Sequence, residues 1–140
     1  MTTIHLSRLD DAFHLRATNA AGATADLDGA PAIGGHDLGL RPMEMLLAAV
    51  AGCASIDLGL FLKKQRQTLR DLKIRVDGTR EPGEEPPRVW TAIHLHFDLY
   101  GDLKQNRVER ALELAVKKYC SVAEMLNKTA EISYDYTIHE

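Results

Sequence analysis

The feature that most constrains this 140-residue chain is an apolar stretch from Met43 to Leu62. At about 100° per residue its apolar side chains cover almost the whole circumference of a helix. Such a helix must be buried on all sides. Pro42 marks its start, because proline is favoured at the first helical position. One sheet can cover only one side of this helix, so we expect a second subunit to cover the other.

The same stretch is long enough to span a membrane, but it contains Glu44 and Asp57. Two carboxylates would be costly in a lone span, so we predict a buried helix of a soluble protein. The N-terminus lacks a basic segment followed by an apolar one, so we expect no secretory signal and a cytoplasmic location. The net charge of −3 argues weakly against nucleic acid. We therefore expect neither a membrane nor nucleic acid as a partner.

Apolar and polar residues alternate in short runs, which predicts strands. The expected strands lie near residues 4–7, 13–18 and 23–27, and then near 72–77, 93–99 and 132–138. We expect the first helix to continue as a basic segment from Lys63 to Arg70, and a second helical region over 104–128. The order βββ-α-ββ-α-β predicts a single α+β domain covering residues 1–140.

The chain has two cysteines, Cys53 and Cys120, too few for a disulfide framework. The plain interpretation is two small buried apolar side chains. Cys53 lies in mid-helix, where only a neighbouring cation would make it a nucleophile. Ser121 and Glu124 fit a capping box, which predicts a helix break with Cys120 just before the new N-terminus. Unpaired N–H groups there would favour a thiolate. The alternative is a continuous helix through Ser121.

The two cysteines lie in the segments PMEMLLAAVAGC, residues 42–53, and YCSVAEML, residues 119–126. Both segments resemble motifs of the OsmC/Ohr family, and the first is similar to the segment that carries that family's peroxide-attacking cysteine. The segment YCSVAEML, residues 119–126, is similar to its second-cysteine motif, and the surroundings are most similar to the YhfA-like branch. The resemblance covers nearly the whole chain. It implies an intertwined homodimer in which two long central helices pack on antiparallel sheets.

The resemblance also implies a chemistry. The Cys53 thiolate would attack a small organic hydroperoxide or hydrogen peroxide and become a sulfenic acid. Cys120 would condense with it, and an external dithiol would reduce the resulting disulfide.

The chain departs from the family pattern at two positions. The peroxidase branches place a glutamate ten residues before the first cysteine, where this chain has Met43. Glu44 follows, but nine residues at about 100° place it roughly opposite Cys53. Glu44 could instead stabilise the helix, because its negative charge lies near the positive N-terminal end of the helix dipole. No arginine matches the family's active-site arginine: Arg41 and Arg16 could each reach a thiolate or lie exposed. The resulting candidate catalytic residues are Cys53, Cys120, Glu44 and Arg41.

Other polar residues leave alternatives open. Asp57 shares a helix face with Cys53. It could oppose a thiolate, anchor a cation, or bond to backbone as a buried polar group. His94 and His96 share a strand face and could bind zinc with a cysteine. They alternate with apolar residues and lack ligand spacing, which favours solvent-facing side chains. We expect no metal and no cofactor.

The sequence is compatible with two functions. One is a thiol peroxidase, favoured by two cysteines in matching motifs. The other is a weakly active or non-catalytic dimeric module that senses redox state or binds a small ligand on the same scaffold. The second is favoured by Met43 and by the unassigned arginine.

Overall fold

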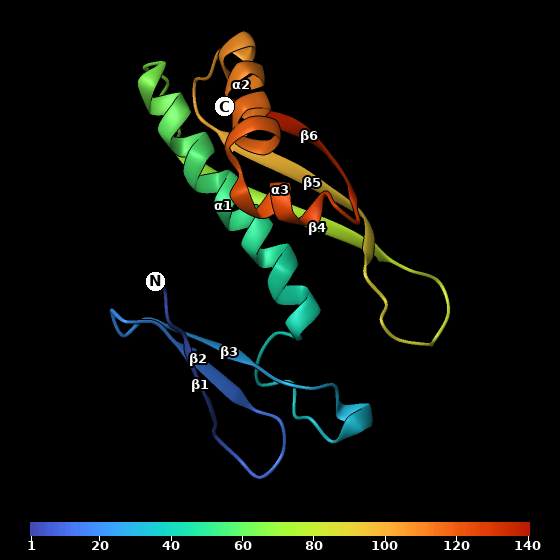
Figure 1. Cartoon of the computed structure of the whole chain (residues 1–140). Helices are drawn as coiled ribbons and strands as arrows, with labels where there is room; N and C mark the ends of the chain where they lie inside the picture. The colour runs from blue at the N-terminus through green and yellow to red at the C-terminus, as the bar shows by residue number, and fades with distance from the viewer. The chain divides into compact units, whose positions relative to one another are not determined.

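The computed structural model describes residues 1–140, which form two compact units, residues 1–46 and residues 47–140. The elements follow the predicted order βββ-α-ββ-α-β, so the mixed α+β class is confirmed (Figure 1). They are β1 (His5–Arg8), β2 (Leu15–Thr18), β3 (Thr24–Leu27), η1 (Pro31–Ile33), α1 (Pro42–Lys64), β4 (Asp71–Arg80), β5 (Trp90–Tyr100), α2 (Gln105–Leu112), η2 (Glu113–Tyr119), α3 (Ser121–Leu126) and β6 (Glu131–His139).

The C-terminal unit has its core between a three-stranded sheet, ordered β4-β5-β6, and the helices on one face of it (Figure 1). Alternate residues of the central strand β5 point into this core and are fully buried, since strand side chains alternate between faces. Those residues are Ile93, Leu95, Phe97 and Leu99. The helices contribute Val50, Ala54, Leu58, Leu62, Val108, Ala111, Leu112 and Ala115, all fully buried.

The strand pairs of this sheet differ in direction. β4 and β5 form the expected antiparallel pair, but β5 and β6 are parallel. The expectation of purely antiparallel sheets is therefore wrong for this pair. The reason is the helical connection over residues 105–126, because such a crossover returns the chain in the same direction. The second helical region is also not one long helix but three short segments, α2, η2 and α3.

Helix α1 starts at Pro42 as predicted, but it ends at Lys64 and does not continue to Arg70. Arg66 adopts a left-handed conformation with φ 59°. Its N–H donates to the Lys63 carbonyl at 3.0 Å, and the Gln67 N–H donates to the Leu62 carbonyl at 2.9 Å. This pair of bonds is a Schellman motif, which usually has glycine at the left-handed position. An arginine there hid the helix end from the sequence pattern.

The N-terminal unit is an antiparallel sheet ordered β1-β2-β3. Leu6, Ala17 and Ala25 lie in register across it and form an apolar stripe. Leu6 is 57% exposed, and so is Ile4. Phe13, expected to begin the second strand, lies before β2 and is exposed. This sheet therefore carries an apolar face with little cover inside its own unit.

Asp28 holds the loop that follows β3. Its carboxylate accepts backbone N–H bonds from Gly29, His36 and Leu38 at 2.7–3.1 Å. Burial acts to raise the pKa of Asp28, but these three donors together lower it below the usual carboxyl range. The side chain is an ionised acceptor that fixes the backbone leading into α1.

Candidate functional site

The two cysteines, far apart in the chain, meet in the C-terminal unit. Cys53 lies in the middle of α1 and is half-buried, whereas Cys120 is 3% exposed. The Cys53 thiol lies close enough to act on Cys120 by a side-chain hydrogen bond and by charge, and both influences raise the pKa of Cys120. Both thiols are free. The packing of α1 against the second helical region thus brings the two predicted sulfurs into contact.

Cys120 lies at the predicted break of the second helical region. Its backbone is extended (φ −73°, ψ 103°), and its Sγ accepts the Ala123 N–H at 3.3 Å. The break is confirmed, but the cap is Cys120 itself and not Ser121. Glu124 does not complete a capping box either, since its carboxylate accepts from Asn127 and Lys128.

Burial is the main influence on the Cys120 thiol and raises its pKa. The Ala123 N–H acts in the opposite direction, and the neighbouring Cys53 raises the pKa further. The expectation that the helix start would favour a thiolate at Cys120 is therefore wrong, because the loss of hydration outweighs the two backbone donors, the N–H groups of Val122 and Ala123. Cys120 is a protonated thiol at neutral pH.

The segment η2, immediately before Cys120, is a π-helix of seven residues. Leu112, Val116 and Cys120 are buried and recur every four residues. In an α-helix each step of four over-rotates by about 40°, so Cys120 would drift about 80° from Leu112. The wider turn of a π-helix, closed by i→i+5 bonds, reduces that drift. Val116 within the π-helix and Cys120 just after it are both buried.

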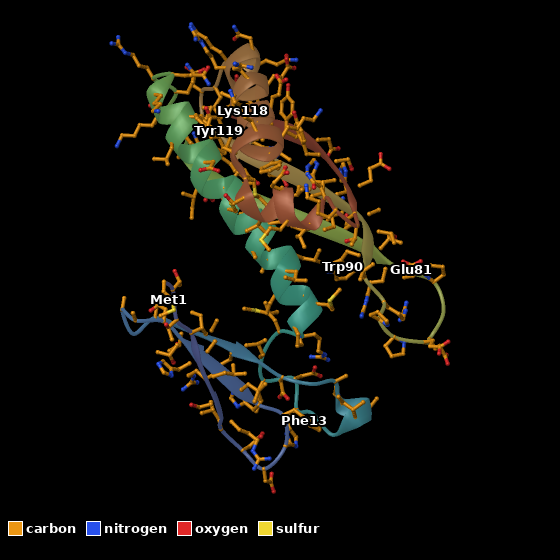
Figure 2. All side chains as sticks on the ribbon, viewed as in Figure 1. Met1, Phe13, Glu81, Trp90, Lys118 and Tyr119 are labelled. Atoms are coloured by element: carbon orange, nitrogen blue, oxygen red, sulfur yellow. The ribbon has the colours of Figure 1, made fainter.

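The residue next to Cys120 makes a contact that the sequence did not suggest. Tyr119, labelled in Figure 2, packs on Phe61 of α1 with ring centroids 5.2 Å apart and planes inclined by 53°. The Lys118 ammonium lies 5.4 Å from the Tyr119 ring centroid. An aromatic residue beside a cysteine was the only available signal, and it does not reveal its partner.

Comparisons with known proteins bear on this site. Residues 34–135 match the family model described as OsmC-like protein. Protein YhfA of Escherichia coli (strain K12) is 46% identical over 98 residues, which cover 69% of this chain and 72% of YhfA. The chain belongs to the OsmC-like family.

Solved structures agree with this membership. A hypothetical protein from Aquifex aeolicus VF5 is 27% identical with a TM-score of 0.79, over 100% of this chain and 98% of that chain. The organic hydroperoxide resistance protein OhrB of Bacillus subtilis shares the fold at 18% identity, with a TM-score of 0.67 over 96% and 98% of the two chains. Membership in the OsmC-like family supports a redox role for the chain.

The two other candidate residues of this OsmC-like chain are engaged near the start of α1. The Glu44 carboxylate accepts the Arg41 N–H at 2.8 Å, which satisfies one unpaired donor of the helix N-terminus. The Arg41 guanidinium pairs with Asp37. Arg16 pairs with Asp26 at 2.7 Å. A catalytic role for Glu44 and Arg41 stays a prediction.

The two cysteines have no positively charged partner among the contacts of the C-terminal unit. Within the C-terminal unit no basic side chain is hydrogen-bonded or ion-paired to either sulfur. Asp57, one turn after Cys53, is half-buried. Asp57 is therefore not a fully buried polar group, and its role beside Cys53 stays a prediction. A positive group that would stabilise a thiolate at Cys53 therefore stays unassigned.

His94 and His96 lie on the outer face of the second sheet, as predicted, in a chain of hydrogen bonds with carboxylates. Asp135 accepts from both histidines at 2.8–2.9 Å. Asp98 lies 3.3 Å from His96 and 2.8 Å from His139. The bond to Asp135 is the main cause that raises the pKa of His96. The histidines therefore lie on the polar face of the sheet, away from the cysteines.

Proposed function

We propose that this protein is a thiol-dependent peroxidase that reduces organic hydroperoxides or hydrogen peroxide through Cys53 and Cys120. The observation that carries the proposal is the contact between these two thiols. Family membership and the printed descriptions of relatives such as OhrB support the same chemistry.

The exposure of the two thiols gives the order of the steps. Cys53 is half-buried and can meet a small substrate, whereas Cys120 is 3% exposed. The Cys53 thiolate attacks the terminal peroxide oxygen and the O–O bond breaks. The leaving oxygen takes a proton and departs as an alcohol, or as water from hydrogen peroxide. Cys53 is thereby oxidised to a sulfenic acid.

Cys120 then resolves the sulfenic acid. Because burial raises its pKa, it keeps its proton until the second step. Its sulfur attacks the Cys53 sulfur, the S–O bond breaks, and the hydroxyl group leaves as water with the Cys120 proton. An external dithiol reduces the disulfide by two electrons and restores both thiols.

We further propose that the protein works as a homodimer in the cytoplasm. Helix α1 exposes Ile56 (67%) and Leu60 (55%) on either side of Asp57. By length and composition α1 could cross a membrane, and 22% of its most apolar window is buried. Asp57 on this face and the family assignment favour a second copy as its cover. A cation of that copy beside Asp57 would also supply the missing positive group near Cys53.

A second candidate is a redox-sensing or small-ligand-binding module. Met43 in place of a glutamate favours it. So does an open apolar hollow of about 220 Å³ in the N-terminal unit. Its walls are formed by Phe13, Leu15, Leu27, Asp28, Gly29, Ile33 and Pro42.

A titration of free thiols after one equivalent of an organic hydroperoxide separates the two candidates. We expect the wild type to lose both thiols and release one alcohol. Cys53→Ser should keep its remaining thiol, and Cys120→Ser should accumulate a sulfenic acid that dimedone traps. Survival of both wild-type thiols in excess hydroperoxide would eliminate the peroxidase and leave the binding or sensing module.

A further inference from the structure

We infer that Phe61 and Tyr119 are positioning residues that hold Cys120 against Cys53 and so set how readily the disulfide closes. The aromatic pair and the thiol pair join the same two elements, α1 and the segment that ends in Cys120. The catalytic consequence rests on the proposed peroxidase function, whereas the positioning effect itself does not.

The two contacts join α1 at two points to the segment that contains Tyr119 and Cys120. Tyr119 and Cys120 are consecutive, so their Cα atoms are about 3.8 Å apart. Phe61 and Cys53 are eight residues apart on α1, which is about 12 Å along the helix axis. A single contact would let the segment at Cys120 pivot on α1. Two contacts at separated points fix its position and its direction.

The residues around this point differ in burial, because Val116, Cys120 and Ala123 are buried whereas Tyr119 is exposed. Tyr119 is 51% exposed, and Cys120 has an extended backbone between η2 and α3. Helix α3 has six residues, too few for a helix to be stable by itself. The Phe61 ring is therefore a lateral support of the exposed residue next to the buried thiol. Lys118 adds a cation over the same Tyr119 ring.

The size of the effect follows from the energetics of aromatic pairs. Such pairs contribute enough beyond their buried area to change an equilibrium by about two- to tenfold. If the contact aligns the thiols, this factor appears in the effective concentration of one thiol at the other. Cys53 itself does not depend on Tyr119, so its first reaction with peroxide should not change.

Thiol exchange with glutathione tests the inference without any peroxide. The dithiol protein and one glutathione disulfide give the intrachain disulfide and two glutathione thiols, so the balance is complete. We expect Tyr119→Leu and Phe61→Leu to lower this equilibrium constant by about two- to tenfold. Tyr119→Phe keeps the ring and should match the wild type. Thermal unfolding of each variant in the Cys53→Ser background reports any general loss of stability.

The kinetic counterpart uses a rapid-mixing experiment with organic hydroperoxide. We expect the rate of sulfenic acid formation at Cys53 to stay unchanged in Tyr119→Leu, while disulfide closure slows by the same factor as the exchange constant. A merely structural role would move both rates. Should Tyr119→Leu fail to fold, Phe61→Leu carries the same test.

The outcomes separate the two proposals. Equal exchange constants in all four proteins would overturn the positioning role, whatever the peroxide activity. Different exchange constants in a protein that consumes no peroxide would support the positioning role and refute the peroxidase.

Discussion

The two three-stranded sheets of this chain have similar alternating sequences but different surroundings. In the C-terminal sheet Phe97 and its apolar neighbours on β5 are fully buried. In the N-terminal sheet Leu6 lies in register with Ala17 and Ala25, yet it is 57% exposed. Alternation therefore predicts a strand and its two faces but not the layer that covers the apolar face. We interpret the N-terminal stripe as a surface that a second copy covers.

The largest effect should come from the complete core. Phe97→Ala removes a fully buried ring on the central strand and leaves a cavity. We expect the free energy of unfolding to fall by about 3–5 kcal/mol. Urea unfolding followed by circular dichroism measures this loss. A loss below about 1 kcal/mol would show that the helices do not seal this face of the sheet.

The N-terminal stripe tests the other half of the comparison. If a second copy covers the stripe, Leu6→Ala should lower the free energy of unfolding by about 2–4 kcal/mol and shift sedimentation toward the monomer. His5→Ala, the neighbouring position on the opposite face of β1, is the matched control and should cost under about 0.5 kcal/mol. Equal, small costs for both variants at every protein concentration would mean that the stripe stays uncovered.

The polar faces of the two sheets should respond differently to alkaline pH. The pKa of His96 is raised above 6.5, chiefly by Asp135. Its contribution to stability is present below pH 6.5 and is lost as the pH rises through the folded-state pKa. The pKa of Asp26 is lowered below 3.8, chiefly by Arg16. That contribution is present above pH 3.8 and persists in alkali, because arginine stays charged.

Unfolding free energies from about pH 5 to about pH 9 measure this difference. The gap between the wild type and His96→Gln should shrink as the pH rises, whereas the gap for Arg16→Gln should stay level. A His96→Gln gap that grows with pH would contradict the charged pair with Asp135.

The smallest effect concerns the end of α1. Arg66 is held in a left-handed conformation that glycine adopts without cost. We expect Arg66→Gly to raise the free energy of unfolding by about 1 kcal/mol, while Arg66→Ala, which keeps the penalty, stays near the wild type. Destabilisation by Arg66→Gly would show that the arginine side chain holds the turn.

Much of the fold could be predicted from the sequence, because alternation and the proline at position 42 are local signals. The end of α1 was missed because Arg66 takes a position that usually has glycine. The cap of α3 was placed one residue late because a cysteine sulfur is an uncommon acceptor there. The parallel β5–β6 pair follows from the helical connection between these strands, which the sequence pattern did predict, so this direction could have been inferred and was missed.

The candidate site could be predicted only in part, because several of its features depend on tertiary packing. The two motifs marked Cys53 and Cys120, but the balance between burial and a backbone donor at Cys120 depends on the packed core. The Phe61–Tyr119 contact joins residues far apart in the chain and has no sequence signature. The positive group that would stabilise a Cys53 thiolate stays unassigned, because no basic side chain is paired with either sulfur.

As the proposed peroxidase, the protein oxidises Cys53 and Cys120 together, and the two thiols pass two electrons to one hydroperoxide. Intact mass and peptide mapping after one equivalent of hydroperoxide test this central claim most directly. The account predicts a chain lighter by two hydrogens, with a peptide that joins Cys53 to Cys120 and one alcohol released. An unchanged mass, or stable oxygen on Cys53 while Cys120 remains a free thiol, would contradict it.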